Sequence, residues 1–492
     1  MENSPIYRLP PELLNDIFLR CLPIKANFKP GSAPLLLTHV CRVWRTAALA
    51  CPRLWTHIEV PDWQEAGPHV ADLVELWLAR AGSSAPLDID IAMFDQDVQL
   101  FPTEEETATL YATLARMIDA FQPHRNRVHK FRGVFPESFM PAIGVGEMVN
   151  AEGIFCCGLL SDDMNEQNEL PQMKLDLGPP RSGLRSLAIC GCAANLQSIS
   201  LQTQLTHIEL IDLLPGGDLC QEAALELLSL PNLKSAVLDL SKYDKPDLRP
   251  PEERLVLTSL EILFVTWSFP ADVSVLLDGV AAPKLTRLGL RGTPVTVQEP
   301  WQSLRAFLAA SRATLQRLSL GDFSFIEIQL LDCLRQCPEL VHLAINHTSI
   351  PDTVLHALTC TDDAWEMQLL PKLQILSIGV CSGFIVDSLT RFLKSRSTDV
   401  PPGISELDEV AIIYCDDITV RTRPLLEACG IKNLVLEVVD NDPVYPYARV
   451  VETHRELLSL LYELDTSEDL EDLENSEVLG ETEGAEDEEE NG

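Results

Sequence analysis

The residues with the clearest chemical use are basic side chains at equivalent places in successive leucine-rich segments. Arg287, Arg317 and His342 each follow the first leucine of a Leu-x-x-Leu-x-Leu pattern by two residues, and Arg291 lies further along the segment of Arg287. Guanidinium groups pair carboxylates or phosphates through two parallel hydrogen bonds. The chain has 37 Lys and Arg against 74 Asp and Glu, so a basic set is the exception. This basic set predicts a binding site for an acidic or phosphorylated segment of a protein substrate.

Two alternatives to this substrate site stay open. Nearby acids such as Asp322 and Asp239 can neutralise the basic set. The acidic C-terminal segment can also fold over it. Either alternative would also relieve the repulsion between like charges at facing positions of a sheet.

Sequence patterns for other chemistry are missing. The sequence has no phosphate-binding P-loop, no Gly-x-Ser-x-Gly elbow and no His-Glu-x-x-His. Cys333 and Cys337 share a helix face, with His342 beyond them, like one corner of a metal site. Cysteine is, however, among the most often buried residue types, so we expect both in the core. We therefore expect no catalytic residue, no metal and no cofactor.

The elements that must position the basic set form a repeat. Leu-x-x-Leu-x-Leu or a close variant occurs ten times from Leu184 to Leu436, at intervals of 21 to 34 residues. Leucine-rich repeats have periods of roughly 20–29 residues, each unit being a short strand and a returning helix stacked into a curved solenoid. Neighbouring parallel strands lie about 4.8 Å apart, so the third residues of successive units should form a continuous row. These are Ser186, His207, Ser235, Ile262, Arg287, Arg317, His342, Ile375, Glu409 and Asn433.

The region before the first clear repeat is less regular. We interpret it as atypical early repeats, with helices and strands that alternate. The expected elements are a helix at 70–81, a strand at 87–91, a helix at 104–121 and a strand at 128–135; loop insertions are expected at 136–180 and 243–253.

The N-terminus contains two short helical stretches. Leu9-Pro10-Pro11-Glu12-Leu13-Leu14 places proline and an early carboxylate where a helix starts, and apolar residues recur from there to Phe18. A second helix is expected from Leu36 to Ala47, followed by Pro52-Arg53-Leu54-Trp55. Two or three helices of this size barely build a core of their own, so a partner that completes the core is expected.

In this order and spacing the two stretches resemble an F-box. Leu54-Trp55 and the later Trp77-Leu78-Ala79-Arg80-Ala81-Gly82, which leads into Pro86-Leu87-Asp88-Ile89, are similar to the large F-box families of mushroom-forming fungi. The resemblance covers about a tenth of the chain. It implies a substrate-recognition subunit of an SCF-type ubiquitin ligase, which docks on a Skp-family adaptor and through it on a cullin scaffold. It also implies the residues that would face the adaptor: Leu9, Pro10, Leu14, Ile17, Phe18, Val40, Cys41 and Trp44.

The charge of the chain excludes some functions and supports one alternative. A net charge of −37 argues against nucleic-acid binding. The segment from Glu456 to the end has 16 acidic and no basic residues, so the remainder still carries −21. An acidic leucine-rich scaffold or chaperone for basic proteins such as histones, independent of ubiquitin ligation, fits this charge.

The expected organisation is α/β. It has a helical F-box domain at 5–58, a linker with irregular early repeats at 59–183, a leucine-rich-repeat domain at 184–455 and a disordered acidic tail at 456–492. No apolar run is long enough to span a bilayer, and the N-terminus has no secretion signal. We therefore expect reduced cysteines, no membrane partner and a cytoplasmic or nuclear location, or both.

Overall fold

A computed structural model describes most of the chain. The chain divides into two compact units, Met1–Val439 and Asp440–Gly492, and the described residues all belong to the first. Among them, no helix combines the length and the apolar character needed to cross a membrane. The described residues are 9–23, 28–60, 67–92, 104–159, 174–211, 213, 219, 221–240, 254–267, 270–292, 301–311, 314–322, 327–360, 369–398, 400–416 and 418–437.

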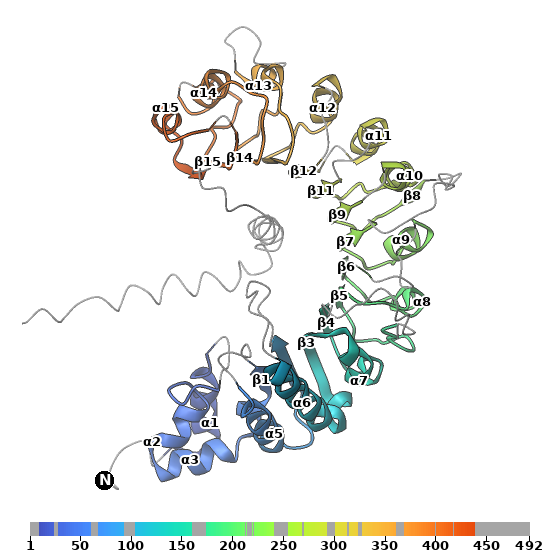
Figure 1. The fold of residues 1–492 in the computed structure, drawn as a ribbon, viewed down its shortest axis with the longest axis vertical. Coiled ribbons are helices and arrows are strands. Elements are labelled where there is room, and N and C mark those ends of the chain that lie inside the picture. The colour runs from blue at the N-terminus through green and yellow to red at the C-terminus, as the bar shows by residue number, and fades with distance from the viewer. Residues whose placement is uncertain are drawn as a thin grey trace, which may run out of the picture. The chain divides into compact units, whose positions relative to one another are not determined.

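A single sheet of fourteen parallel strands organises the first unit (Figure 1). The strands follow one another in chain order, while β8 (Leu255–Val256) and β10 (Val280–Ala281) pair separately. The fourteen are β1 (His57–Val60), β2 (Leu87–Ala92), β3 (Val128–Pro136), β4 (Gly153–Leu159), β5 (Ser186–Cys190), β6 (His207–Ile211), β7 (Ser235–Asp239), β9 (Ile262–Thr266), β11 (Arg287–Arg291), β12 (Arg317–Gly321), β13 (His342–Asn346), β14 (Ile375–Gly379), β15 (Glu409–Ile413) and β16 (Asn433–Glu437).

Helices of the repeats cover one face of this sheet, and we call the opposite face the strand face (Figure 1). Consecutive helices pack on one another, for example α10 on α11 and α13 on α14. They are α5 (Val70–Arg80), α6 (Glu104–Phe121), α7 (Met140–Ile143), α8 (Leu196–Ser200), α9 (Gln221–Leu228), α10 (Pro270–Gly279), α11 (Trp301–Ser311), α12 (Glu327–Leu334), α13 (Asp352–Leu358), α14 (Val386–Ser395) and α15 (Arg423–Glu427). Short 3₁₀ turns join them at η3 (Gln122–Arg127), η4 (Glu137–Phe139) and η5 (Val145–Glu147).

The leucine pattern explains which face of each strand is buried. Side chains alternate across a strand, so the second and third leucines of a unit point together into the core. In β12, Leu318 and Leu320 are buried, whereas Arg317 and Ser319 are only half-buried on the strand face. Each fully buried leucine stabilises the fold by about 1.5–3 kcal/mol relative to an exposed one. All ten predicted repeat strands are confirmed, and each begins at the third residue of its pattern.

The early region follows the same architecture more closely than predicted. The two helices and two strands expected between 70 and 135 are confirmed as α5, β2, α6 and β3. The expected loop at 136–180 is wrong in part, because β4 lies within it and pairs with both β3 and β5. Ile154 and Cys156 of β4 are buried in place of the usual leucines. The expected loop at 243–253 and the tail at 456–492 lie outside the described residues.

Three short helices and a 3₁₀ turn precede the sheet: α1 (Pro11–Arg20), α2 (Leu35–Val40), α3 (Arg42–Leu49) and η2 (Pro52–Trp55). The single helix expected from Leu36 to Ala47 is divided at Cys41, whose backbone is extended. The Cys41 sulfur accepts a hydrogen bond from the Trp44 N–H, and Arg45 Nε donates to the Thr38 carbonyl at 2.9 Å. These bonds satisfy backbone groups that the break exposes.

Candidate functional site

The strand face brings the predicted basic positions together. Arg287 pairs in register with Arg317, and Arg317 with His342, on the adjacent strands β11, β12 and β13. Arg291 faces Gly321 in the same way. The predicted row of positions is therefore confirmed, with neighbouring Cα atoms about 4.8 Å apart.

His342 does not contribute a positive charge to this row. Its side chain is buried, and this burial, with a smaller effect of Arg317, lowers its pKa to about 4. The Nε2 atom lies 3.4 Å from the Ser377 hydroxyl, a neutral partner. The expectation that His342 is cationic at neutral pH is wrong, because an imidazolium would lose its hydration there.

Arg291 is paired within the protein. Its Nε donates to a carboxylate oxygen of Asp322 at 2.5 Å, and the other carboxylate oxygen lies 3.9 Å from His347 Nδ1. Burial is the main cause that lowers the pKa of His347. Neutralisation by Asp322, one of the two alternatives left by the sequence, therefore applies to Arg291. Asp239, the other acid considered, accepts a hydrogen bond from Thr266 at 2.6 Å.

Cys333 and Cys337 belong to the core, as predicted. Cys333 lies on α12 and Cys337 in the turn that follows it, and both side chains are fully buried. This burial raises the pKa of each thiol to about 12. His342 starts a strand whose first side chain lies on the strand face, so the three residues do not converge. Among the described residues, no group of three metal-ligating side chains is close enough to hold an ion.

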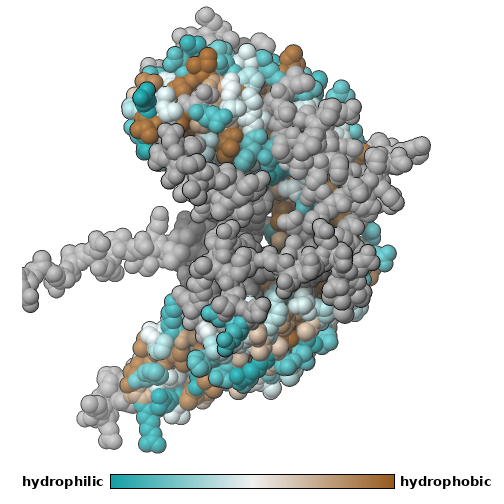
Figure 2. Space-filling view, in the orientation of Figure 1, coloured by the Kyte–Doolittle hydropathy of each residue, from teal (hydrophilic) through white to brown (hydrophobic). Residues whose placement is uncertain are grey.

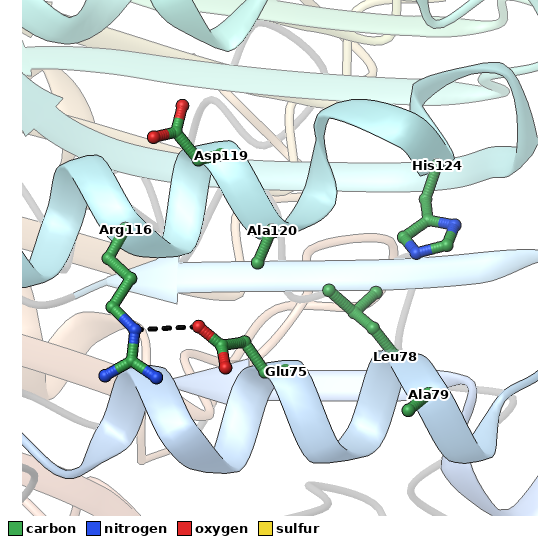
Figure 3. Close-up of a pocket in the computed structure, with 7 residues that line it drawn as sticks. All are labelled: Glu75, Leu78, Ala79, Arg116, Asp119, Ala120 and His124. Carbon is green, nitrogen blue, oxygen red and sulfur yellow. Dashed lines mark hydrogen bonds and ion pairs between the residues drawn. The ribbon is translucent and has the colours of Figure 1, made fainter.

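A pocket of about 440 Å³ lies between α5 and α6 (Figure 3). Arg116 on its wall donates to Glu75 at 2.7 Å and to Asp72 at 2.5 Å, and these bonds raise the pKa of the guanidinium. His124, at the other end, has a pKa lowered by burial. The Arg116 cation is thus already paired twice, so we assign the pocket no function.

The N-terminal helices carry a concentration of exposed apolar side chains. In the described part of the chain, sixteen large apolar residues are markedly exposed, and six of them lie on α1, α2 and α3. Hydrophobic residues are visible on the surface of this region in Figure 2. Several exposed apolar residues in one region often mark a site where a protein binds a partner, whereas single exposed apolar residues are ordinary. We call this set the apolar patch: Leu13, Ile17, Leu36, Val40, Val43 and Leu49.

The eight residues assigned to the adaptor from the sequence fall into three groups. Pro10, Ile17 and Val40 are exposed, and Leu9, Cys41 and Trp44 are half-buried. Leu14 and Phe18 are buried, and the Phe18 ring packs on Trp44 with centroids 5.0 Å apart. In this conformation Leu14 and Phe18 support α1 from within instead of facing a partner.

Four members of the apolar patch were not assigned from the sequence: Leu13, Leu36, Val43 and Leu49. A signal for Leu13 was present. Leu13 and Ile17 lie four residues apart, as do Leu14 and Phe18, so α1 has two apolar stripes. Only one stripe can face the core of so small a module.

The buried His342 predicts a loss of stability in acid. Its pKa is about 4 in the folded protein against about 6.5 when unfolded, so the unfolded state binds more protons between these values. Stability should therefore fall as the pH drops from about 6.5 to 4, by on the order of 3 kcal/mol from this residue alone. His342→Gln should show a smaller decrease between pH 7 and 4.5 in denaturant midpoints. His39→Gln, at an exposed histidine, is the matched control; equal slopes in the two variants would contradict the assignment.

Comparison with known proteins gives little further information. No protein-family model matches the sequence, and no curated protein matches it. Among solved structures, one that is similar is the crystal structure of the Rad7 and Elc1 complex in yeast. The match has 16% sequence identity and a TM-score of 0.33, and it covers 50% of this chain and 61% of that chain. This chain therefore spans about three fifths of that neighbour's length, and a likeness of this size supports no conclusion about function.

Proposed function

We propose that this chain is a substrate-recognition subunit of an SCF-type ubiquitin ligase. The N-terminal helices would dock on a Skp-family adaptor and, through it, on a cullin scaffold. The repeat sheet would hold a protein substrate on its strand face. Such a subunit performs no chemistry itself, because its contribution is to raise the local concentration of the substrate and to fix its orientation.

The apolar patch is the observation that carries this proposal. It lies on the helices whose sequence resembles an F-box, and it is formed by residues that could have been polar without loss to the core. Ile17 and Val40 are 40% and 53% exposed, and both were assigned to the adaptor from the resemblance. A partner that covers the patch would remove this apolar surface from water, which stabilises a complex by about 25 cal/mol per Å² of apolar area before other costs.

Co-purification with a Skp-family adaptor tests the proposal. Wild-type chain should retain the adaptor, and Ile17→Asp combined with Val40→Asp should weaken capture by about a hundredfold, because two charges would be buried in an apolar interface. Leu76→Asp is the matched control, since Leu76 is 40% exposed on α5, outside the patch. Failure of a folded wild type to retain the adaptor would overturn the proposal.

The acidic scaffold remains a second candidate on the strength of the charge alone. The net charge of −37 and the 16 acids from Glu456 onward would attract basic proteins such as histones. Truncation before Glu456 separates the two functions. Histone binding that disappears with the tail, in a chain that retains no adaptor, would favour the scaffold.

A further inference from the structure

Two cysteines lie side by side on neighbouring strands in the early part of the sheet. Cys157 of β4 pairs in register with Cys190 of β5, and both are in the reduced thiol state. Side chains alternate across a strand, so these two lie on the strand face, whereas the neighbouring Cys156 points into the core. We call Cys157 and Cys190 the cysteine pair.

Two glycines allow the chains to approach closely at the cysteine pair. Gly158 directly follows Cys157, and Gly191 directly follows Cys190. A Cβ on either glycine would collide with the carbonyl oxygen of the other, and Gly191 also has a φ of 61°, which favours glycine. Neighbouring strands lie about 4.8 Å apart, within the range of about 4.4–6.8 Å that a disulfide spans between Cα atoms. The backbone therefore holds the pair at a separation at which a disulfide can form.

The two cysteines differ in their access to water. Cys190 is half-buried, whereas Cys157 is 3% exposed. Apolar side chains flank the pair in register, Val134 beside Cys157 and Ile211 beside Cys190. A small oxidant therefore reaches Cys190 first, and Cys157 needs to reach only the neighbouring sulfur. Cys156 is less reactive, because its complete burial is the main cause that raises its pKa and makes its thiolate scarce.

We propose that the cysteine pair is a reversible oxidation site, which hydrogen peroxide converts from two thiols into one disulfide. The Cys190 thiolate attacks the peroxide, so that an S–O bond forms, the O–O bond breaks, and the leaving hydroxide takes up a proton to become water. The Cys157 sulfur then attacks the sulfenic acid of Cys190, so that the S–S bond forms and the S–O bond breaks. The second hydroxide takes the Cys157 proton and leaves as water. The two sulfur atoms together lose two electrons, and one molecule of peroxide gains them.

The disulfide would tie β4 to β5 at a strand whose core positions hold Ile154 and Cys156 in place of leucines. A cross-link across a long loop restricts the unfolded chain, so the oxidised sheet should open less readily at this place. The strand spacing slightly exceeds the separation of about 3.5–4.5 Å between the Cβ atoms of a relaxed disulfide, so a thiol reductant should open the bond readily. This inference does not depend on the proposed function, because oxidation needs neither an adaptor nor a substrate.

Peroxide treatment of the reduced full chain tests the proposal. Remaining thiols are alkylated under denaturing conditions, and mass spectrometry of the digested chain identifies the joined cysteines. Wild type should give a Cys157–Cys190 cross-link that dithiothreitol removes, and its denaturant midpoint should be higher before this reduction than after it. Cys156→Ala is the matched control, because it removes the adjacent thiol and should leave the cross-link unchanged.

Two further variants test the order of the steps. Cys157→Ala should stop at the Cys190 sulfenic acid, and trapping of this acid by dimedone should rise about tenfold or more over wild type. Cys190→Ala should give neither the cross-link nor a dimedone adduct at Cys157. Cys21 is an exposed cysteine, so its oxidation shows that the peroxide concentration is sufficient. A cross-link through Cys156, or a wild type in which the pair stays reduced while Cys21 is oxidised, would overturn the site.

Discussion

Trp77→Ala is expected to lower the free energy of unfolding by about 3–5 kcal/mol, the cost typical of removing a large aromatic side chain from a core. Trp77 is 1% exposed on α5, the first helix of the repeats. Its ring meets Trp55 edge-on with centroids 4.9 Å apart, and Phe28 edge-on at 4.8 Å. Each such aromatic pair contributes about 0.5–1.5 kcal/mol beyond the area it buries.

The same substitution should separate the N-terminal helices from the sheet. Trp55 follows α3 and its indole N–H donates to the Ala48 carbonyl at 3.0 Å, while the Arg80 guanidinium of α5 lies 4.3 Å from its ring. Trp77 and Arg80 are the two residues of α5 that contact this indole. The proposed role in substrate recognition requires this junction to be rigid, because the orientation of a substrate would depend on it.

Chemical denaturation and amide hydrogen exchange together measure this effect. Exchange should accelerate most in α1, α2 and α3, and least in β12 to β14, because repeats contact only their neighbours. Leu76→Ala, the adjacent residue at an exposed position of α5, is the matched control. A uniform increase in exchange along the chain would contradict a local role of the junction.

The repeat strands could be predicted to the residue because their signal is local. In β12, Leu315, Leu318 and Leu320 fix both the start of the strand and the face that is buried. A shift by one residue would place every leucine on the strand face, so that register is excluded. Aligned patterns then give the pairing of Arg287 with Arg317 without any knowledge of the loops between them.

Elements without that signal were missed for identifiable reasons. In β4, Ile154 and Cys156 replace the leucines, and only the sheet on both sides shows that the segment is a strand. The break at Cys41 depends on bonds from Trp44 and Arg45 that no apolar period encodes. Similarly, both stripes of α1 have helical spacing, and the packing of Phe18 on Trp44 decides which one is buried.

Charge states in the site also depend on tertiary structure. The position of His342 follows from the repeat, but its lowered pKa follows from burial among neighbouring strands. Asp322, whose carboxylate pairs with Arg291, itself has a φ of 59°. This is a left-handed conformation in which aspartate is tolerated. The sequence identified this acid as a candidate partner, but the turn after β12 is what brings its carboxylate to Arg291.

Arg396→Ala should destabilise the C-terminal repeats by about 3–5 kcal/mol, since each buried polar group that loses its partner costs on the order of 1–3 kcal/mol. Arg396 follows α14 and is 0% exposed. Its guanidinium donates to the carbonyls of Leu358 at 3.1 Å, Leu369 at 2.6 Å and Leu370 at 2.8 Å. The side chain thus ties the end of α13 to the turn that leads into β14.

Arg396→Lys should recover only part of this loss, because an ammonium group cannot direct hydrogen bonds from three separate nitrogens to these carbonyls. Arg391→Ala, at an exposed arginine of α14, is the matched control and should leave stability nearly unchanged. Denaturant midpoints and exchange rates of β13 to β15 provide the measurement. Equal stability of the Arg396→Ala and Arg391→Ala variants would show that the three hydrogen bonds contribute little.

Loss of Arg396 should affect the two proposed interactions differently. Arg396 holds the turn that leads into β14, the strand that pairs with β13. Binding of a protein substrate on the strand face should therefore fall with the stability of these strands. The N-terminal helices lie at the other end of a structure in which each repeat contacts only its neighbours, so adaptor capture should persist. Loss of both interactions together would mean that the whole sheet unfolds as one cooperative unit.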